Sequence, residues 1–440
     1  MSEQNNTVDS MLPIPKLFAY GLQHVLAMYA GAVAVPIIIA QAMHLPVEDL
    51  IRLITADLFT CGIATLIQTL GFGNIGGRIP MIQGVTFASV GPMAMIGAQH
   101  GMTAIYGAII IAGIFTFLVA PFFSRLIRLF PPVVTGTIIT IIGINLMPVA
   151  VNWMGGGVGN PQFGSLTNIG LGFLTFLIVI FTYKFVKGFL GNLSVLIGLI
   201  AGTAIAFAMG VANFAEVGKA HWLAVIEPLY FGLPTFDWAS VISMVVVMLV
   251  VMVETTGDSI AIGEIVDKKI DRKELASIIR ADGLSTVIGG ILNSFPYTAF
   301  AQNVGLIAVT RVKSRFVVAA SGVILILLGL FPKLAAVVAS IPNAVLGGAG
   351  IAMFGMIIAS GIRSLGKVNF DGNQNLMLVA ISIGVSMIPI AAPTFYAHFP
   401  AWAQILLKSG ITFGSIMAIL LNLLLNGVNK GDEFKEMGRR

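Results

Sequence analysis

Long apolar runs, separated by short polar breaks, recur along the whole chain. A helix needs about 20 residues to cross the hydrocarbon core of a bilayer, and most of these runs come close to that length. The pattern predicts about fourteen membrane-spanning segments, at residues 17–39, 50–71, 80–98, 102–123, 130–151, 168–186, 193–212, 238–263, 275–292, 296–312, 315–332, 335–360, 374–392 and 402–426. We therefore expect an all-α, polytopic membrane protein.

Composition strengthens this expectation and narrows the function. Of the 440 residues, 57% are hydrophobic and 10% are charged, and the mean hydropathy is +0.97, whereas soluble domains carry about 25% charged residues. In such a chain the net charge of +5 reports on topology and does not indicate nucleic-acid binding. Residues 1–10 are polar and acidic and do not resemble a cleaved signal peptide.

The residues that carry most enzyme chemistry are scarce. The single cysteine, Cys61, excludes an intrachain disulfide and a cysteine-based metal site, and the five histidines lack metal-binding spacing. No Ser/His/Asp constellation and no ring-forming filter motif stands out, which disfavours an enzyme and a channel. We expect no metal and no cofactor.

Basic residues gather on one side of the predicted topology. With the N-terminus inside, the cytoplasmic side holds Arg78, Arg125, Arg128, Lys184, Lys187, Lys268, Lys269, Arg272, Lys273, Arg311, Lys313, Arg315, Arg363, Lys367, Lys430, Lys435, Arg439 and Arg440. The opposite side keeps only Arg52, Lys219, Lys333 and Lys408. The positive-inside rule therefore predicts that both termini are cytoplasmic.

Two segments interrupt the apolar pattern with proline, glycine and amide residues. They are residues 79–87 and 293–315, and in both a proline is followed by a short extended stretch and then by a glutamine near an expected helix start. A faint repeat relates 130–136 to 341–347, which predicts two inverted halves of seven spans. Paired, interrupted segments in corresponding positions point to a transporter binding site.

The second interrupted segment can be divided further. Pro296 lacks a backbone donor and disfavours helix before it, so we expect a short strand over 296–301. Gln302 and Asn303 bring hydrogen-bonding groups side by side, and a half-helix is expected from Gly305. The basic cluster that follows is best explained as a cytoplasmic anchor.

Acidic residues inside apolar spans are costly and usually functional. Glu254 and Asp258 are four residues apart, on one face of a predicted helix. Asp282 opens the apolar part of segment 275–292. The alternatives are a packing pair for the first two residues, and for Asp282 a helix N-cap or a partner of Arg280.

Polar residues in two further spans complete the candidate set. Gln23 and His24 interrupt the first span, where His24 either relays a proton or supports the structure. Gln83 and Thr86 precede Phe87, a combination that suits a flat heterocycle because amides bind ring edges and an aromatic ring stacks on the ring face. The alternative is polar contact between spans.

The run from Gln302 to Arg311 resembles the signature of the nucleobase–ascorbate transporter family. That signature is Gln, Glu or Pro, then Asn-x-Gly-x4-Thr, followed by Arg, Lys or Gly, and every fixed position is met. Gln23 with His24, Gln83 and Glu254 also match in type and order. The resemblance covers nearly the whole chain.

The resemblance implies a fold and a mechanism. The fold has fourteen spans in two inverted seven-span repeats, with short antiparallel strands in spans three and ten. A core domain would comprise residues 1–126 and 236–333, and a gate domain 127–215 and 334–427. Family members are typically homodimers that use an elevator-like motion, and microbial members are proton symporters.

The resemblance also implies roles for the candidate residues. Substrate contacts would come from Glu254, Gln302, Gln83, Phe87, Thr86 and Asn303, and support or proton coupling from Asp258, Asp282, His24 and Gln23. Uracil-type members usually carry Glu where this chain has Gln302, and xanthine-preferring members often carry Asn where it has Thr86. The expected substrate is therefore an oxidised purine, urate and/or xanthine.

The expected function is proton-coupled uptake of this purine across the bacterial cytoplasmic membrane. Two alternatives stay open, a symporter of uracil or another nucleobase and an anion exchanger of the same fold.

Overall fold

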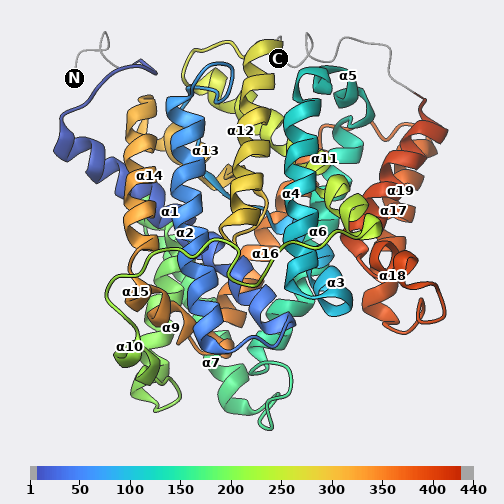
Figure 1. Ribbon diagram of the computed structural model, residues 1–440. Coiled ribbons are helices and arrows are strands. Elements are labelled where there is room, and N and C mark those ends of the chain that lie inside the picture. Colours follow the sequence, from blue (N-terminus) through green and yellow to red (C-terminus); the bar gives the residue numbers. More distant parts are fainter. Residues whose placement is uncertain (1–6, 428–440) are drawn as a thin grey trace.

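Helices make up most of the described chain, residues 7–427, in this computed structural model (Figure 1). The helices of eight or more residues are α1 (Ile14–Ala42), α2 (Val47–Leu70), α3 (Val90–His100), α4 (Met102–Val119), α6 (Pro132–Met154), α7 (Leu166–Phe185), α9 (Ser194–Ala208), α11 (Trp238–Ile265), α12 (Arg272–Ile291), α13 (Ala301–Thr310), α14 (Arg315–Gly329), α15 (Pro332–Ala339), α16 (Asn343–Leu365), α17 (Asn373–Ala391) and α19 (Gly410–Leu425). Shorter pieces are α5 (Phe123–Leu126), α8 (Phe189–Asn192), α10 (Ala215–Lys219), α18 (Ala401–Leu407) and the 3₁₀ turns η2 (Phe87–Ser89), η3 (Ala120–Phe122) and η4 (Ile127–Leu129). Two short strands, β1 (Gln83–Val85) and β2 (Tyr297–Ala299), complete the fold.

Eight helices of the described residues are long and apolar enough to cross a membrane. They are α1, α2, α4 with η3, α6, α7, α11, α16 and α17. Two bent pairs, α14–α15 at 81° and α18–α19 at 76°, raise the number to ten if each pair is one span. The other four predicted spans correspond to α9, α12 and the interrupted segments β1–α3 and β2–α13, which are shorter or more polar. The chain is a mostly helical, multi-pass membrane protein.

The predicted span 335–360 is wrong at its start. Helix α15 ends at Ala339, and α16 begins only at Asn343, after Pro342 in an extended conformation. Proline lacks an N–H group and disfavours helix at the residue before it, so the chain breaks here. Pro131 precedes α6 in the same way, so both members of the sequence repeat mark a helix start.

Glycines allow the closest helix crossings. A Cβ on Gly62 of α2 would lie 2.4 Å from the carbonyl oxygen of Gly322 in α14, and one on Gly113 of α4 would lie 2.8 Å from that of Gly283 in α12. Gly361 brings α16 against the backbone of α6 in the same way. Small residues let helices approach closely in lipid, where the hydrophobic effect does not drive helices together.

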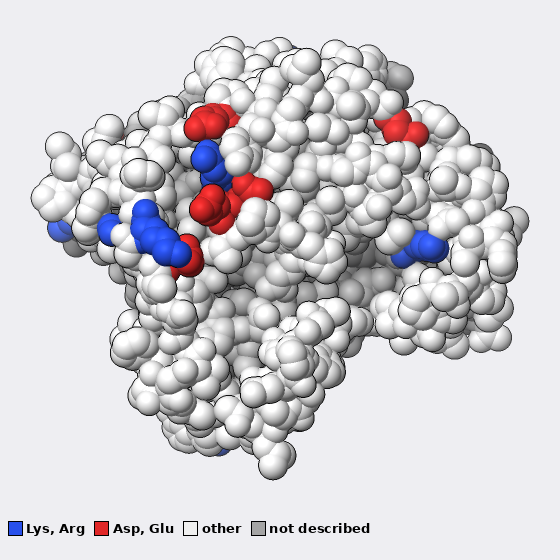
Figure 2. Space-filling model, turned by 60° about the horizontal axis from the view of Figure 1, so that its bottom comes forward, with Lys and Arg blue, Asp and Glu red and all other residues white. Residues whose placement is uncertain are grey.

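The two described chain ends, Thr7 and Gly427, lie toward the same end of the molecule, the upper end of Figure 1. The lower end carries α10, α15 and α18 (Figure 1), and most of its surface is uncharged, with charged side chains gathered mainly over one part of it (Figure 2). The predicted basic tail, which contains Lys430, Lys435, Arg439 and Arg440, lies outside the described residues, as do the side chains of Arg125 and Arg128.

Candidate functional site

The two interrupted segments meet as a pair of antiparallel strands, β1 and β2. The paired residues are Gln83 with Ala299, Gly84 with Thr298 and Val85 with Tyr297. Backbone hydrogen bonds from Thr86 to Pro296 (2.9 Å) and from Phe300 to Ile82 (3.2 Å) extend the pairing at both ends. All six strand residues are buried, so irregular backbone occurs here only where protein covers it.

The centre of β1 requires a glycine. A Cβ on Gly84 would lie 2.4 Å from two ring atoms of Phe300 and 3.0 Å from the Cε of Met28. Glycine in a strand often marks such a close approach. The packing of Phe300 on Gly84 therefore fixes the start of α13 against β1.

The sequence prediction placed one helix start too late and one glutamine in the wrong element. Helix α13 begins at Ala301, directly after Phe300 in an extended conformation, so Gln302 and Asn303 lie in its first turn and not before it. Gln83 lies within β1, whereas we expected it near a helix start. Alanine and glutamine, the first two residues of α13, form helix readily, so the helix begins ahead of Gly305.

Asn303 joins α13 to α1 through His24. Its Nδ2 donates to the Nδ1 of His24 at 3.1 Å and to the carbonyl oxygen of His24 at 2.9 Å, and both side chains are buried. This contact requires the tautomer in which Nδ1 is the acceptor and Nε2 carries the proton. Gln23, beside it on α1, is half-buried.

The carboxylates of α11 and the glutamine of α13 lie where the packing is open. Helix α11 packs against both β2 and α13. Glu254 and Asp258 are half-buried, and Gln302 is exposed. A Cβ added at Gly257 or at Gly305 would meet no atom within 4 Å. The polar groups are therefore accessible to a small ligand at this point.

A third carboxyl group lies on α12, which packs against β2. Asp282 of α12 is fully buried, and the polar side chains that approach it are Thr255 of α11 and Gln83 of β1. Neither amide atom of buried Gln83 forms a hydrogen bond of normal geometry to a described residue. The Gln83 amide thus retains donor and acceptor capacity for a ligand.

The two structural alternatives for Asp282 are wrong. Helix α12 starts at Arg272 with Asp271 as its N-cap, and Glu274 completes a capping box, so Asp282 lies well inside the helix. Arg280 donates to the carbonyl oxygen of Asn74 at 3.3 Å.

Thr86 and Phe87 are buried at the junction between β1 and α3. The hydroxyl of Thr86 accepts from the backbone N–H of Ala88 at 3.2 Å, which caps η2. The ring of Phe87 meets that of Phe354 in α16 edge to face, with centroids 5.8 Å apart. Phe87 therefore brings η2, the turn that follows β1, against α16.

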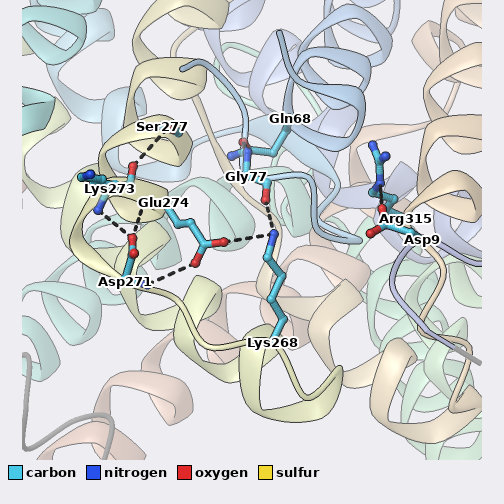
Figure 3. A network of polar contacts seen from close by, with 9 residues as sticks. All are labelled: Asp9, Gln68, Gly77, Lys268, Asp271, Lys273, Glu274, Ser277 and Arg315. Carbon is cyan, nitrogen blue, oxygen red and sulfur yellow. Dashed lines mark hydrogen bonds and ion pairs between the residues drawn. The ribbon is translucent and has the colours of Figure 1, made fainter. Parts of the chain in front are cut away.

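Figure 3 shows how the chain is held just before β1. The Nζ of Lys268, between α11 and α12, donates to the carbonyl oxygen of Gly77 at 3.0 Å and pairs with Glu274 at 3.3 Å. The backbone N–H of Gly77 donates to the Oε1 of Gln68 at 2.9 Å. These contacts tie the segment that leads into β1 to α2 and α12.

The basic residues after α13 make structural contacts. Lys313 pairs with Asp267 at 2.5 Å. Arg315 pairs with Asp9 at 2.6 Å and donates to the carbonyl oxygen of Thr69 at 2.7 Å. These contacts fit an anchor better than a ligand site.

Asp57 was not among the residues predicted from the sequence. This residue is fully buried in α2, and its Oδ1 accepts from the hydroxyls of Ser294 (3.0 Å) and Tyr297 (3.3 Å). The available signal was an acid between Ala56 and Leu58 in the middle of a predicted span, which is by itself grounds for a functional hypothesis.

A polar contact between α1 and the α6–α16 pair was missed as well. Gln41 donates to Asn343 at 2.9 Å, and the indole N–H of Trp153 donates to Gln41. The amides of Gln41 and Asn343 are 302 residues apart in sequence, and no sequence pattern joined them.

Comparison with known proteins identifies the family. The family model described as a permease family matches residues 15–395. The chain is 46% identical to the uric acid transporter UacT of Escherichia coli over 424 residues, which is 96% of this chain and 88% of the relative. It is 44% identical to the xanthine permease of Bacillus subtilis over 421 residues, 96% of each chain.

Solved structures show the same fold at low identity. The transmembrane domain of a cyanobacterial bicarbonate transporter, BicA, matches with a TM-score of 0.61 and 13% identity, over 95% of this chain and 100% of that domain. The structure of SLC26A9 matches with a TM-score of 0.59 and 11% identity, over 94% and 66%. Taken with the strand pair and the Gln302–Arg311 signature, these matches show that the chain is a membrane transporter, not an enzyme, and belongs to the permease family of xanthine and urate transporters, the nucleobase–ascorbate transporter family.

Proposed function

We propose that this protein takes up an oxidised purine, urate and/or xanthine, across the bacterial cytoplasmic membrane in symport with protons. The observation that carries the proposal is the position of Gln302, in the first turn of α13 beside the strand pair and next to α11 with Glu254. The relatives named above transport uric acid and xanthine by their names.

The chemistry of the site suits such a ligand. The amides of Gln302 and Gln83 each offer a donor and an acceptor, which match the alternating N–H and C=O edge of an oxidised purine. The carboxylate of Glu254 would accept from ring N–H groups and binds them best when ionised. A site built on such hydrogen bonds rejects analogues that leave its polar groups unpaired.

We propose that Phe87, Thr86 and Asn303 complete the substrate site formed by Gln302, Gln83 and Glu254, each in a different way. Phe87 would stack on the purine ring. Thr86 and Asn303 would act mainly by shaping the site, because the first caps η2 and the second is bound to His24. Asp258, Asp282 and Gln23 would support the site or the proton step.

The packing supports fourteen spans in two inverted repeats. If α1–α9 and α11–α19 are equivalent halves, the pair α2–α14 corresponds to α12–α4, and α7–α9 corresponds to α17–α19. All four pairs are packed together, and α6 packs on α16, its own counterpart. The antiparallel β1–β2 pair fits the same two-fold relation.

Each half would contribute its first four spans to a core domain, residues 1–126 and 236–333, and its last three spans to a gate domain, residues 127–215 and 334–427. The core would carry the strand pair and move against the gate in an elevator-like motion. The contact between Gln41 and Asn343 joins the two parts in this structure, so transport would require it to break. Both termini would be cytoplasmic, and the protein would work as a homodimer.

Uptake in cells that lack their own purine permeases tests the function. Cells that express the chain should accumulate labelled urate or xanthine, and a protonophore should abolish accumulation. Absence of uptake of both purines refutes the substrate, and uptake that is insensitive to the protonophore and to external pH refutes proton coupling.

One substitution tests the site in the same assay. Gln302→Glu replaces a donor–acceptor pair by acceptors only, so it should change selectivity or abolish transport while the protein stays in the membrane. The matched control is Val309→Ala, on the exposed side of the same helix. Unchanged kinetics for Gln302→Glu would exclude Gln302 from the site.

The fold likeness to a bicarbonate transporter supports anion exchange as the second candidate. Uptake of labelled bicarbonate or sulfate by the same cells, without uptake of purine, would favour anion exchange. Uracil uptake in place of both oxidised purines would favour another nucleobase symporter.

A further inference from the structure

A cavity of about 540 Å³ opens at the lower end of the molecule, and its lining includes no residue of β1 or β2. Figure 2 shows acidic and basic side chains gathered over one part of this end. The cavity is lined by Glu48, Ile51, Arg52, Thr55, Ala56, Glu216, Lys219, Ala220, His221, Ala224, Val225, Ile226, Glu227, Tyr230, Phe231, Asn293 and Pro332. Its walls are therefore the first turns of α2 and the segment around α10, and it is wide enough for several water molecules.

The floor of this cavity adjoins Asp57. Ala56 and Asn293 line the cavity, and the residues that follow them, Asp57 and Ser294, are hydrogen-bonded to each other at 3.0 Å. Two buried acceptors at this point, the Oδ2 of Asp57 and the Oδ1 of Asn293, have no hydrogen-bond partner among the described residues. A buried acceptor normally has a donor, and water from the cavity is the nearest source of one.

The contacts of Asp57 are all neutral. Its Oδ1 accepts from Ser294 and Tyr297, and the thiol of Cys61, one turn along α2, lies at 3.7 Å. The titratable side chains in contact with it are thus a phenol and a thiol. Helices α1, α12, α14 and α15, which also pack on α2, give it no ion pair among the described residues.

The charges of the cavity wall are engaged with one another. Arg52 pairs with Glu227 at 3.4 Å and lies over the ring of Tyr230 at 4.3 Å. Lys219 pairs with Glu216 at 2.7 Å. An ionised carboxylate without a cation is costly to bury, so Asp57 is stable here as the neutral acid.

Asp57 is also connected to the strand pair. Tyr297, which donates to it, is the first residue of β2, and the backbone N–H of Tyr297 donates to the hydroxyl of Thr286 at 3.1 Å. Thr286 lies one turn after Asp282 on α12. A change of charge on Asp57 therefore acts directly on the strand that positions α13.

We propose that Asp57 is a proton-binding site loaded from this outer cavity, separate from the carboxylates of α11, and that its protonation sets the position of β2. A proton passes from hydronium in the cavity to the Oδ2 of Asp57, which leaves water and a neutral carboxylic acid. Loss of that proton restores a carboxylate, which Ser294 and Tyr297 then hold more tightly. The inference rests on the proposed proton symport.

The test compares Asp57→Asn with the wild type in proteoliposomes. Asparagine keeps an oxygen for Ser294 and Tyr297 but cannot take up a proton. Accumulation driven by a pH gradient should fall by about tenfold or more, because an intramembrane acid that carries the coupling ion cannot be replaced by an amide. Counterflow exchange of the same purine, which needs no net proton movement, should remain, and Asp57→Glu should restore part of the accumulation.

Each result of this test either supports or overturns the assignment of Asp57. Wild-type accumulation and an unchanged pH profile in Asp57→Asn would overturn the inference, as would equal loss of accumulation and counterflow in folded protein. If Asp57→Asn does not fold, Ser294→Ala replaces it, and an unchanged pH profile of uptake would then overturn the inference. A wild type without any proton dependence would instead refute the proposed function.

A second variant tests the route from the cavity. Ile51→Cys, at a half-buried position of the cavity wall, when labelled from outside with a bulky, membrane-impermeant thiol reagent, should slow proton-driven accumulation and spare counterflow. The native Cys61 is fully buried and serves as the unlabelled background. Full accumulation after complete labelling would exclude the cavity as the route.

Discussion

Removal of the amide of Asn303 tests how α13 is held against α1. The Nδ2 of Asn303 makes two hydrogen bonds, both to His24. Asn303→Ala leaves the Nδ1 and the carbonyl oxygen of His24 without this donor in a buried site. An unpaired buried polar group costs about 1–3 kcal/mol, but hydrogen bonds between membrane helices average only about 0.6 kcal/mol. We therefore expect the free energy of unfolding to fall by about 0.6–3 kcal/mol.

A double-mutant cycle isolates the side-chain bond. His24→Ala removes Nδ1 and keeps the carbonyl oxygen, so the coupling energy between the two variants measures the Nδ2–Nδ1 contact at 3.1 Å. We expect a coupling of about 0.5–1.5 kcal/mol, measured by reversible unfolding in mixed detergent micelles. Additive effects, within about 0.3–0.5 kcal/mol, would refute the contact.

Two further predictions concern helix packing. Gly62→Leu should destabilise the protein by at least about 1–3 kcal/mol, because α2 must move away from the backbone of Gly322; Gly355→Leu, which points into open space on α16, is the control in the same unfolding measurement. Gln41→Ala removes the contact with Asn343 and should shift the population toward conformations in which α1 and α16 are apart, by about fivefold for each 1 kcal/mol lost. Spin-label distances between α1 and α16 measure this shift, and an unchanged distance distribution would contradict it.

The hydrophobic pattern predicts most helices because each span needs its own apolar length. The pattern fails where a proline ends one element and starts the next. The run 335–360 is mostly apolar, yet Pro342 separates the end of one helix from the start of the next. Pro296 was interpreted correctly as the start of a strand, but the strand is shorter than expected because α13 already begins at Ala301.

The sequence identified residues of the site but not the contacts between them. The signature marked Gln302 and Asn303, but only the fold places Asn303 on His24 and Gln83 beside Asp282. Asp57 was detectable as a single acid within a predicted span, but it was not predicted because it belongs to no motif. The contact between Gln41 and Asn343 has no sequence signal, because exposed amides at helix ends are common and the partner of each depends on the whole fold.

Equilibrium binding tests the central claim, that the strand pair and α13 form the purine site. Labelled urate and xanthine should bind the purified protein, and Gln302→Ala should weaken binding of the preferred purine by about 10- to 100-fold, which corresponds to one lost buried hydrogen-bonding group. Val309→Ala on the same helix should bind as the wild type does. Equal affinity in Gln302→Ala and wild type would contradict the claim.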